Sequence, residues 1–162
     1  MSSYLILRFL HVVGAAVLLG TGAGIAFFML MAHRTKDPAL IAHTTGVVVV
    51  ADTIFTAAAV VLQPITGVLL AQQIGWPLTT GWIATSICLY VAVGLCWLPV
   101  VWIQLRMRDI ARAAVAVNAP LPPLYDVLFR RWFLLGIPAF VAVLAIVWLM
   151  LAKPQFRFLG LA

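Results

Sequence analysis

Four long apolar stretches, separated by short polar connections, dominate the sequence of this chain. They extend over residues 4–32, 45–71, 82–105 and 128–152. Each is long enough to cross a bilayer as an α-helix, since one crossing takes roughly 20 predominantly apolar residues. Of the 162 residues, 65% are hydrophobic and 9% are charged, whereas soluble domains are about one quarter charged. We therefore predict an all-α integral membrane protein, a four-transmembrane-helix bundle that forms one domain over residues 1–162.

Basic residues are distributed unevenly between the two ends of this predicted bundle. The ends of the first and third stretches and the start of the fourth hold most of them: Arg34, Lys36, Arg106, Arg108, Arg112, Arg130 and Arg131. The other end holds only Lys153, Arg157 and, within the first stretch, Arg8. By the positive-inside rule, the basic connections are cytoplasmic and both termini lie outside, in the periplasm, for a multi-pass protein of a bacterial inner membrane.

The net charge of +6 does not indicate nucleic-acid binding. The basic residues stand at the ends of apolar stretches and not in a patch with stacking aromatic residues. They are better suited to setting topology and to contacting anionic lipid head groups. The longest connection between stretches is expected from Arg108 to Tyr125.

Small residues and prolines inside the stretches suggest how the helices pack. Gly20 and Gly24 are spaced as in helix pairs that approach closely, and they form a candidate face for a second copy or another membrane protein. One proline lies in each of the later three stretches: Pro64, Pro99 and Pro138. Each is expected to kink its helix and to free a carbonyl group.

Polar side chains inside a membrane are costly, so their positions are informative. At about 100° per residue they fall on one face of each of three helices. These faces contain His11, Ala15, Leu18, Gly22, Met29 and His33 in the first stretch, Thr45, Asp52, Thr56, Gln63 and Thr66 in the second, and Ser86, Tyr90, Trp97 and Gln104 in the third. The fourth stretch has no polar side chain after Phe133 except the indole of Trp148. This pattern predicts a polar interior closed off by an apolar fourth helix.

Counting along the helices divides this interior into two candidate sites. The outer one contains Arg8, His11, Gln63 and Tyr90, and the inner one contains Asp52, Thr56, Trp97 and Gln104. Each residue also has a structural interpretation. His11 is either a neutral histidine bonded to a neighbouring helix or a metal ligand, and Asp52 is either functional or part of a structural pair. Gln63 and Tyr90 either bind a ligand or hold helices together, and His33 and His43 stand at the water interface.

Several stretches resemble a bacterial family of predicted integral membrane proteins, the domain of unknown function 2269. The resemblance rests on residues 10–14, 19–22, 61–67, 96–102, 104, 106–109, 131–133 and 136–140, which include Leu10-His11-Val12-Val13-Gly14 and Val61-Leu62-Gln63-Pro64-Ile65-Thr66-Gly67. The family name implies a membrane topology and no activity.

A shorter likeness concerns the start of the first stretch. Arg8-Phe9-Leu10-His11 is similar to the beginning of the haem-containing membrane protoporphyrinogen oxidase. That resemblance implies that His11 binds the iron of b-type haem, with Arg8 beside a propionate. No second histidine is expected at the depth of His11, so the sixth ligand would come from a second subunit or another residue, or the position would stay open.

Three functional hypotheses follow. In the first, the bundle binds haem b through His11 and serves electron transfer or the oxidation of a porphyrin or quinone, with protons moving along Asp52, Thr56, Gln63 and Gln104. In the second, the same polar stripe is the path of an ion or small solute through a transporter or channel module. In the third, the chain is a structural or assembly subunit that binds a partner through Gly20 and Gly24. The sequence leaves open whether the protein is an enzyme.

Overall fold

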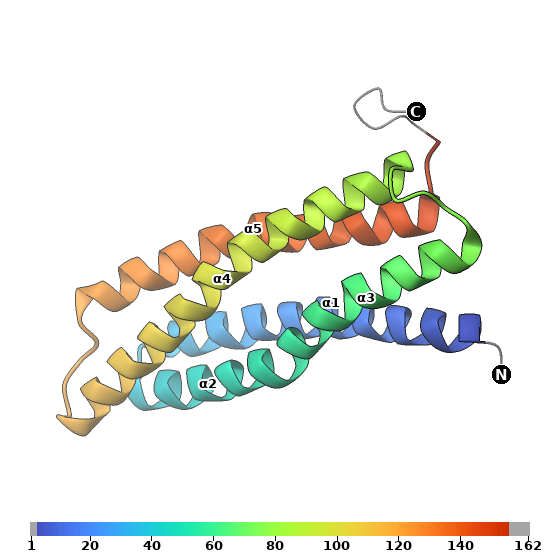
Figure 1. The fold of residues 1–162 in the computed structure, drawn as a ribbon. Helices are drawn as coiled ribbons and strands as arrows, with labels where there is room; N and C mark the ends of the chain where they lie inside the picture. The colour runs from blue at the N-terminus through green and yellow to red at the C-terminus, as the bar shows by residue number, and fades with distance from the viewer. Residues whose placement is uncertain (1–2, 156–162) are drawn as a thin grey trace.

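The chain folds into long α-helices that run side by side (Figure 1). The computed structural model describes residues 3–155, so Arg157 lies outside the described residues. The elements are α1 (Ser3–Thr35), α2 (Pro38–Ala51), the π-helix η1 (Asp52–Thr56), α3 (Ala57–Ile74), α4 (Gly81–Ala116) and α5 (Pro123–Ala152). Because α2, η1 and α3 form one continuous helix, the described part has four helices that are long and apolar enough to span a membrane. The prediction of an all-α protein with four spans is confirmed.

The second span begins earlier than its apolar stretch. Asp37 caps α2, and its side chain accepts hydrogen bonds from the backbone N–H of Ala39 at 2.8 Å and of Leu40 at 3.4 Å. Pro38 follows as the first helical residue, a position where its missing N–H costs nothing. A capping aspartate and a proline therefore fix the helix start seven residues ahead of position 45, where the prediction placed it.

The connection between α4 and α5 is shorter than predicted. The sequence predicts a connection from Arg108 to Tyr125, but α4 continues to Ala116 and α5 begins at Pro123, so this prediction is wrong at both ends. The reason is the amphipathic character of the extension of α4. Its buried face consists of Met107, Ala111 and Ala114, while its charges face outward. A hydropathy profile shows where a run of apolar residues ends. An α-helix can continue beyond that point if one of its faces still packs against other helices.

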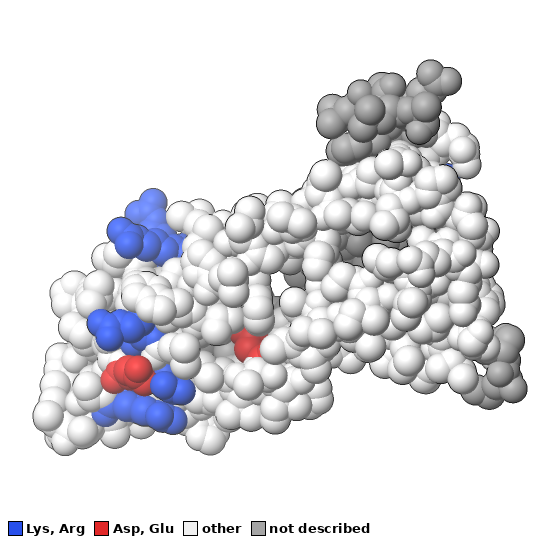
Figure 2. Space-filling model, in the orientation of Figure 1, with Lys and Arg blue, Asp and Glu red and all other residues white. Residues whose placement is uncertain are grey.

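Helix packing differs between the two ends of the bundle. α1 packs against α2 and α3, and α4 packs against α2 and α5. The end that holds the α1–α2 and α4–α5 connections carries most Lys and Arg side chains (Figure 2), and we call it the basic end. At the other end, the pair α1–α3 and the pair α4–α5 lie apart (Figure 1), and we call it the open end.

The hydrophobic core lies toward the basic end. Its fully buried members include Met29 of α1, Ile41 of α2, Met107 of α4 and Tyr125 of α5. The apolar window of α5, in contrast, contains no buried residue. A single continuous core therefore joins α1, α2, α4 and α5 at one end, and the helices diverge from it.

The structure shows where the small residues and the prolines inside the spans lie. A Cβ atom added at Gly20 would meet nothing within 4 Å, and one at Gly24 would meet only the ring of Phe28 on the same helix. The close helix approach expected at these two glycines is therefore not made within the described chain. Pro64, Pro99 and Pro138 lie inside continuous helices, and all three are exposed.

Candidate ligand-binding cavity

A cavity of about 510 Å³ lies between the helices where they begin to diverge. All the helices except α2 contribute to its wall, and most of the lining side chains are apolar, such as Leu18, Val93, Ile137 and Phe140. Figure 2 shows a hollow in the middle of one face of the molecule, away from the basic end. Small-molecule sites in proteins are typically of this size and apolar character.

Polar side chains gather in one part of this apolar wall. Asp52 is 5% exposed and borders the cavity together with Thr56, Trp97 and Gln104. These are the four residues of the inner site predicted from the sequence, and the structure brings them together. Thr56, Trp97 and Gln104 all approach the carboxyl group of Asp52.

Three polar atoms of these neighbours are not paired at standard hydrogen-bond distances and angles. Thr56 Oγ1, Trp97 Nε1 and Gln104 Oε1 are buried and have no hydrogen-bond partner. Leaving a buried polar atom unpaired costs about 1–3 kcal/mol. A polar group bound among them would remove this cost, so the cluster offers a donor, an acceptor and a hydroxyl to the head group of a ligand or to water.

The π-helix η1 presents two residues of this cluster. It spans Asp52–Thr56, and the backbone N–H of Ala57 donates to the carbonyl oxygen of Asp52, five residues back. Within this wide turn Asp52 and Thr56 are both buried, whereas Ile54 and Phe55 are exposed. Single π-turns inside α-helices occur frequently at functional sites. The sequence analysis did not predict this turn.

The outer site predicted around His11 is assembled differently. Gln63 Nε2 donates to the carbonyl oxygen of His11 at 2.8 Å, and His11 Nδ1 lies 2.8 Å from Thr66 Oγ1. The Thr66 hydroxyl itself donates to the carbonyl oxygen of Leu62 at 2.8 Å. It therefore accepts from His11, which places the proton of the neutral ring on Nδ1 and leaves Nε2 as a free lone pair.

Two glycines allow this close contact of α1 with α3. A Cβ atom on Gly14 would collide with Gln63 Nε2, and one on Gly67 would come within 3.3 Å of the His11 ring. Gln63 and His11 thus fit into notches in the opposite helix. The glycines that serve close approach are Gly14 and Gly67, not the pair Gly20 and Gly24.

The other residues of the predicted outer site lie apart. Tyr90 lines the cavity and its hydroxyl donates to the carbonyl oxygen of Val60, so it links α4 to α3. Gln63 also lines the cavity, but Arg8 and His11 do not. Arg8 is exposed on α1. The predicted group of four is therefore divided: Gln63 and Tyr90 line the cavity, His11 lies in the contact of α1 with α3, and Arg8 lies on the surface of α1.

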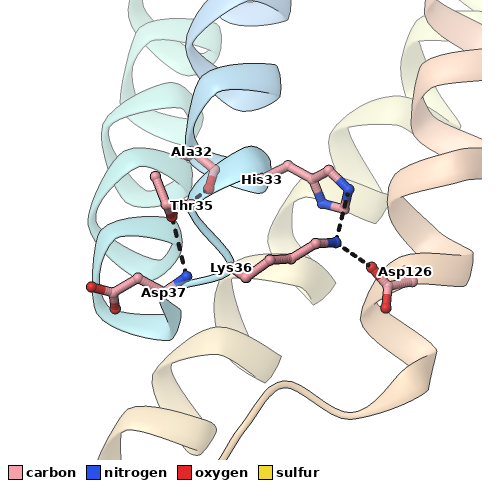
Figure 3. A network of polar contacts seen from close by, with 6 residues as sticks. All are labelled: Ala32, His33, Thr35, Lys36, Asp37 and Asp126. Carbon is pink, nitrogen blue, oxygen red and sulfur yellow. Dashed lines mark hydrogen bonds and ion pairs between the residues drawn. The ribbon is translucent and has the colours of Figure 1, made fainter.

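His33, at the basic end, belongs to a separate network (Figure 3). The His33 ring stacks on Phe129 with a centroid distance of 3.7 Å, and its Nε2 lies 3.3 Å from Lys36 Nζ. Lys36 Nζ in turn lies 3.3 Å from Asp126 Oδ1. Among the described residues, no group of three or more His, Cys, Asp or Glu side chains could hold a metal ion. His33 and His43 lie at the basic end, on either side of the α1–α2 connection, whereas His11 lies in the other half of α1.

Some cavity residues were not singled out in the sequence analysis. Gly94 and Gly136 leave space in α4 and α5, since a Cβ atom on either would meet nothing within 4 Å. Trp132 of α5 is 5% exposed, lines the cavity, and has an indole Nε1 without a partner. α5 is long and apolar enough to span a membrane, and Trp148, its one polar side chain beyond Phe133, is 67% exposed.

The fold defines a polytopic helical membrane protein with a cavity between its spans. Comparison with protein families identifies it further. The family model described as "Predicted integral membrane protein (DUF2269)" matches residues 5–154, and the chain belongs to this family. No curated protein and no solved structure matched the chain in the corresponding searches.

Proposed function

We propose that this protein binds an amphiphilic molecule dissolved in the membrane, with the apolar part in the central cavity and a polar head group against Asp52. The observation that carries the proposal is the cluster of buried, unpartnered polar atoms on Thr56, Trp97 and Gln104, set in an otherwise apolar cavity of about 510 Å³.

The head group that suits this cluster carries carbonyl or hydroxyl oxygens. Trp97 Nε1 can donate to a carbonyl oxygen, and Gln104 Oε1 can accept from a hydroxyl group. Asp52 can take up or release a proton beside that group. A quinone with an isoprenoid tail has this chemistry, and we propose the quinone class as the occupant.

Entry from the bilayer is favoured by the packing of the helices. α3 packs against α1 and makes no extended contact with α4 or α5 among the described residues. Tyr90 is the side chain whose hydrogen bond crosses this gap, to Val60. A molecule dissolved in the lipid could therefore enter sideways between α3 and α4, and it would not need to pass through water.

Two glycines two positions apart on α1 provide a matched test. Gly22 lines the cavity and Gly20 does not, and a Cβ atom on either would meet nothing within 4 Å. Gly22→Leu should fill the cavity, whereas Gly20→Leu should leave it open. The measurement is titration of the purified protein in nanodiscs with a short-chain benzoquinone, combined with mass spectrometry of lipids extracted from the untreated protein.

The proposal predicts that wild type and Gly20→Leu retain and bind the quinone and that Gly22→Leu does not. Trp97→Phe, which removes the donor without changing the apolar wall, should weaken binding by about tenfold, the value of one hydrogen bond to a buried group. Equal binding by Gly22→Leu and wild type would contradict the proposal.

A second candidate is haem b bound through His11. It is favoured by the hydrogen bond from His11 Nδ1 to Thr66 Oγ1, because ligating histidines generally donate their other ring N–H to an acceptor. His11 would supply one axial ligand, and a second copy of the chain could supply another.

Absorbance spectra test the haem candidate separately. Protein expressed with ample haem should show a Soret band that is lost in His11→Ala and shifted in Thr66→Val, which removes the acceptor for Nδ1. A spectrum without a Soret band, or one that His11→Ala does not alter, would exclude this role.

A further inference from the structure

We propose a second binding site on the outside of the bundle, where an anionic phospholipid lies in the groove between α2 and α4. Its phosphate would contact Arg112 and His43, and one acyl chain would lie along Val47 and Val50. This site is independent of the central cavity and shares no lining residue with it.

The groove has a volume of about 470 Å³ and an arrangement that fits a phospholipid. It is lined by Ala42, His43, Gly46, Val47 and Val50 of α2 and by Arg112 of α4. His43, Val47 and Val50 are spaced to lie on one face of α2. Because α2 begins at the basic end, His43 stands near the end of the bundle and the two valines lie about 6 and 10 Å farther along the helix. A head group and the start of its acyl chain follow the same order from the membrane surface inward.

The absence of a side chain at Gly46 leaves room for the guanidinium group of Arg112 in the groove. Arg112 Nη2 lies 3.5 Å from the position that a Cβ atom on Gly46 would occupy. The arginine therefore rests against the backbone of α2, and the site depends on the extension of α4 beyond its apolar stretch. A larger side chain at position 46 would displace the guanidinium from the groove.

The charge of Arg112 is not neutralised within the described chain. Arg108 pairs with Asp109 at 2.9 Å and Lys36 pairs with Asp126 at 3.3 Å, while Arg112 has no ion pair among residues 3–155. The phosphate of an anionic lipid would supply the missing charge, and arginine is well suited to bind phosphate with two parallel hydrogen bonds.

The apolar floor favours a lipid over a free anion. Val47 is 57% exposed and Val50 is 55% exposed, and both line the same groove as Arg112 and His43. A soluble phosphate would use Arg112 and leave the valines uncovered, whereas a phospholipid would cover both. A juxtamembrane basic residue contributes a factor of about five to binding of anionic lipid.

Native mass spectrometry of the full chain, released from detergent with added lipid, tests this site. We expect wild type to retain phosphatidylglycerol about fivefold more than phosphatidylcholine with the same acyl chains, and Arg112→Gln to lose this preference. Gly46→Leu should lose it as well. Arg106→Gln is the matched control, since Arg106 is exposed on the same helix outside the groove.

Two further measurements distinguish lipid binding in this groove from binding in the central cavity and from binding of free phosphate. Gly22→Leu, which fills the central cavity, should keep the phosphatidylglycerol preference, so that this result is independent of the quinone proposal. Inorganic phosphate at millimolar concentration should not displace the lipid. The proposal is wrong if Arg106→Gln and Arg112→Gln reduce the preference equally, if Gly22→Leu abolishes it, or if phosphate alone competes fully.

Discussion

The two ends of the bundle are packed in different ways. At the basic end, residues from α1, α2, α4 and α5 form one continuous core, with Met29, Ile41 and Met107 at most 1% exposed. At the open end, the helices separate into two pairs, and a cavity of about 510 Å³ lies between them. Close packing is what usually stabilises a native state, and cavities cost stability. The difference suggests that the basic end holds the bundle together while the open end is left available to a ligand.

The largest effect should come from the core of the basic end. Met107→Ala removes a fully buried side chain and should lower the free energy of unfolding by about 2–5 kcal/mol. Val93→Ala shortens a partly exposed side chain of the cavity wall and should cost less than about 1 kcal/mol. Equilibrium denaturation in mixed micelles measures both variants. Equal losses would mean that the two ends contribute similarly to stability.

The next effect concerns the close contact between α1 and α3. Gly14→Val would push Gln63 Nε2 away and break its hydrogen bond to the His11 carbonyl oxygen. We expect a loss of about 1–3 kcal/mol. Gly20→Val is the control, because it makes the same change on the same helix where nothing lies within 4 Å. The prediction fails if the two valine variants unfold at the same denaturant concentration.

The same residues show what the sequence could and could not predict. The buried polar side chains of the described chain are Thr45, Asp52, Thr56, Gln63, Thr66, Ser86 and Gln104. Every one belongs to a polar face predicted from helical spacing. Such spacing works here because the spans are regular helices and lipid excludes polar groups from their outer faces.

What spacing could not predict is the relative height and distance of the helices. Counting placed Arg8 and His11 in one site with Gln63 and Tyr90, but only Gln63 and Tyr90 line the cavity. Gly14 and Gly67 determine how closely α1 and α3 approach, and their role is visible only once the two helices are paired. The π-turn at Asp52 depends on backbone hydrogen bonds that are shifted by one residue, which leaves no periodic signal in the sequence.

Two tyrosine hydroxyls allow a smaller test of the comparison. Tyr90 donates to the carbonyl oxygen of Val60 across the open end, whereas the buried hydroxyl of Tyr125 at the basic end has no partner. Tyr90→Phe should therefore cost about 1 kcal/mol, and Tyr125→Phe should be neutral or slightly stabilising, because it removes an unpaired buried group. Denaturation of both variants gives the answer, and a larger loss for Tyr125→Phe would contradict this assignment.

The smallest effect should come from the ion pair at the basic end. The Lys36 and Asp126 side chains are 63% and 62% exposed, with 3.3 Å between Nζ and Oδ1, and exposed pairs contribute about 0.2–1 kcal/mol. A double-mutant cycle with Lys36→Met and Asp126→Asn should give a coupling energy in that range, and raising the salt concentration to about 1 M should reduce it, since charges are then screened over about 3 Å. A coupling energy that is several times larger, or one that salt does not change, would mean that the basic end is held together by charge. The buried positions of Met29, Ile41 and Met107 lead us to expect the opposite, that apolar packing holds this end and the ion pair only joins α5 to the α1–α2 connection.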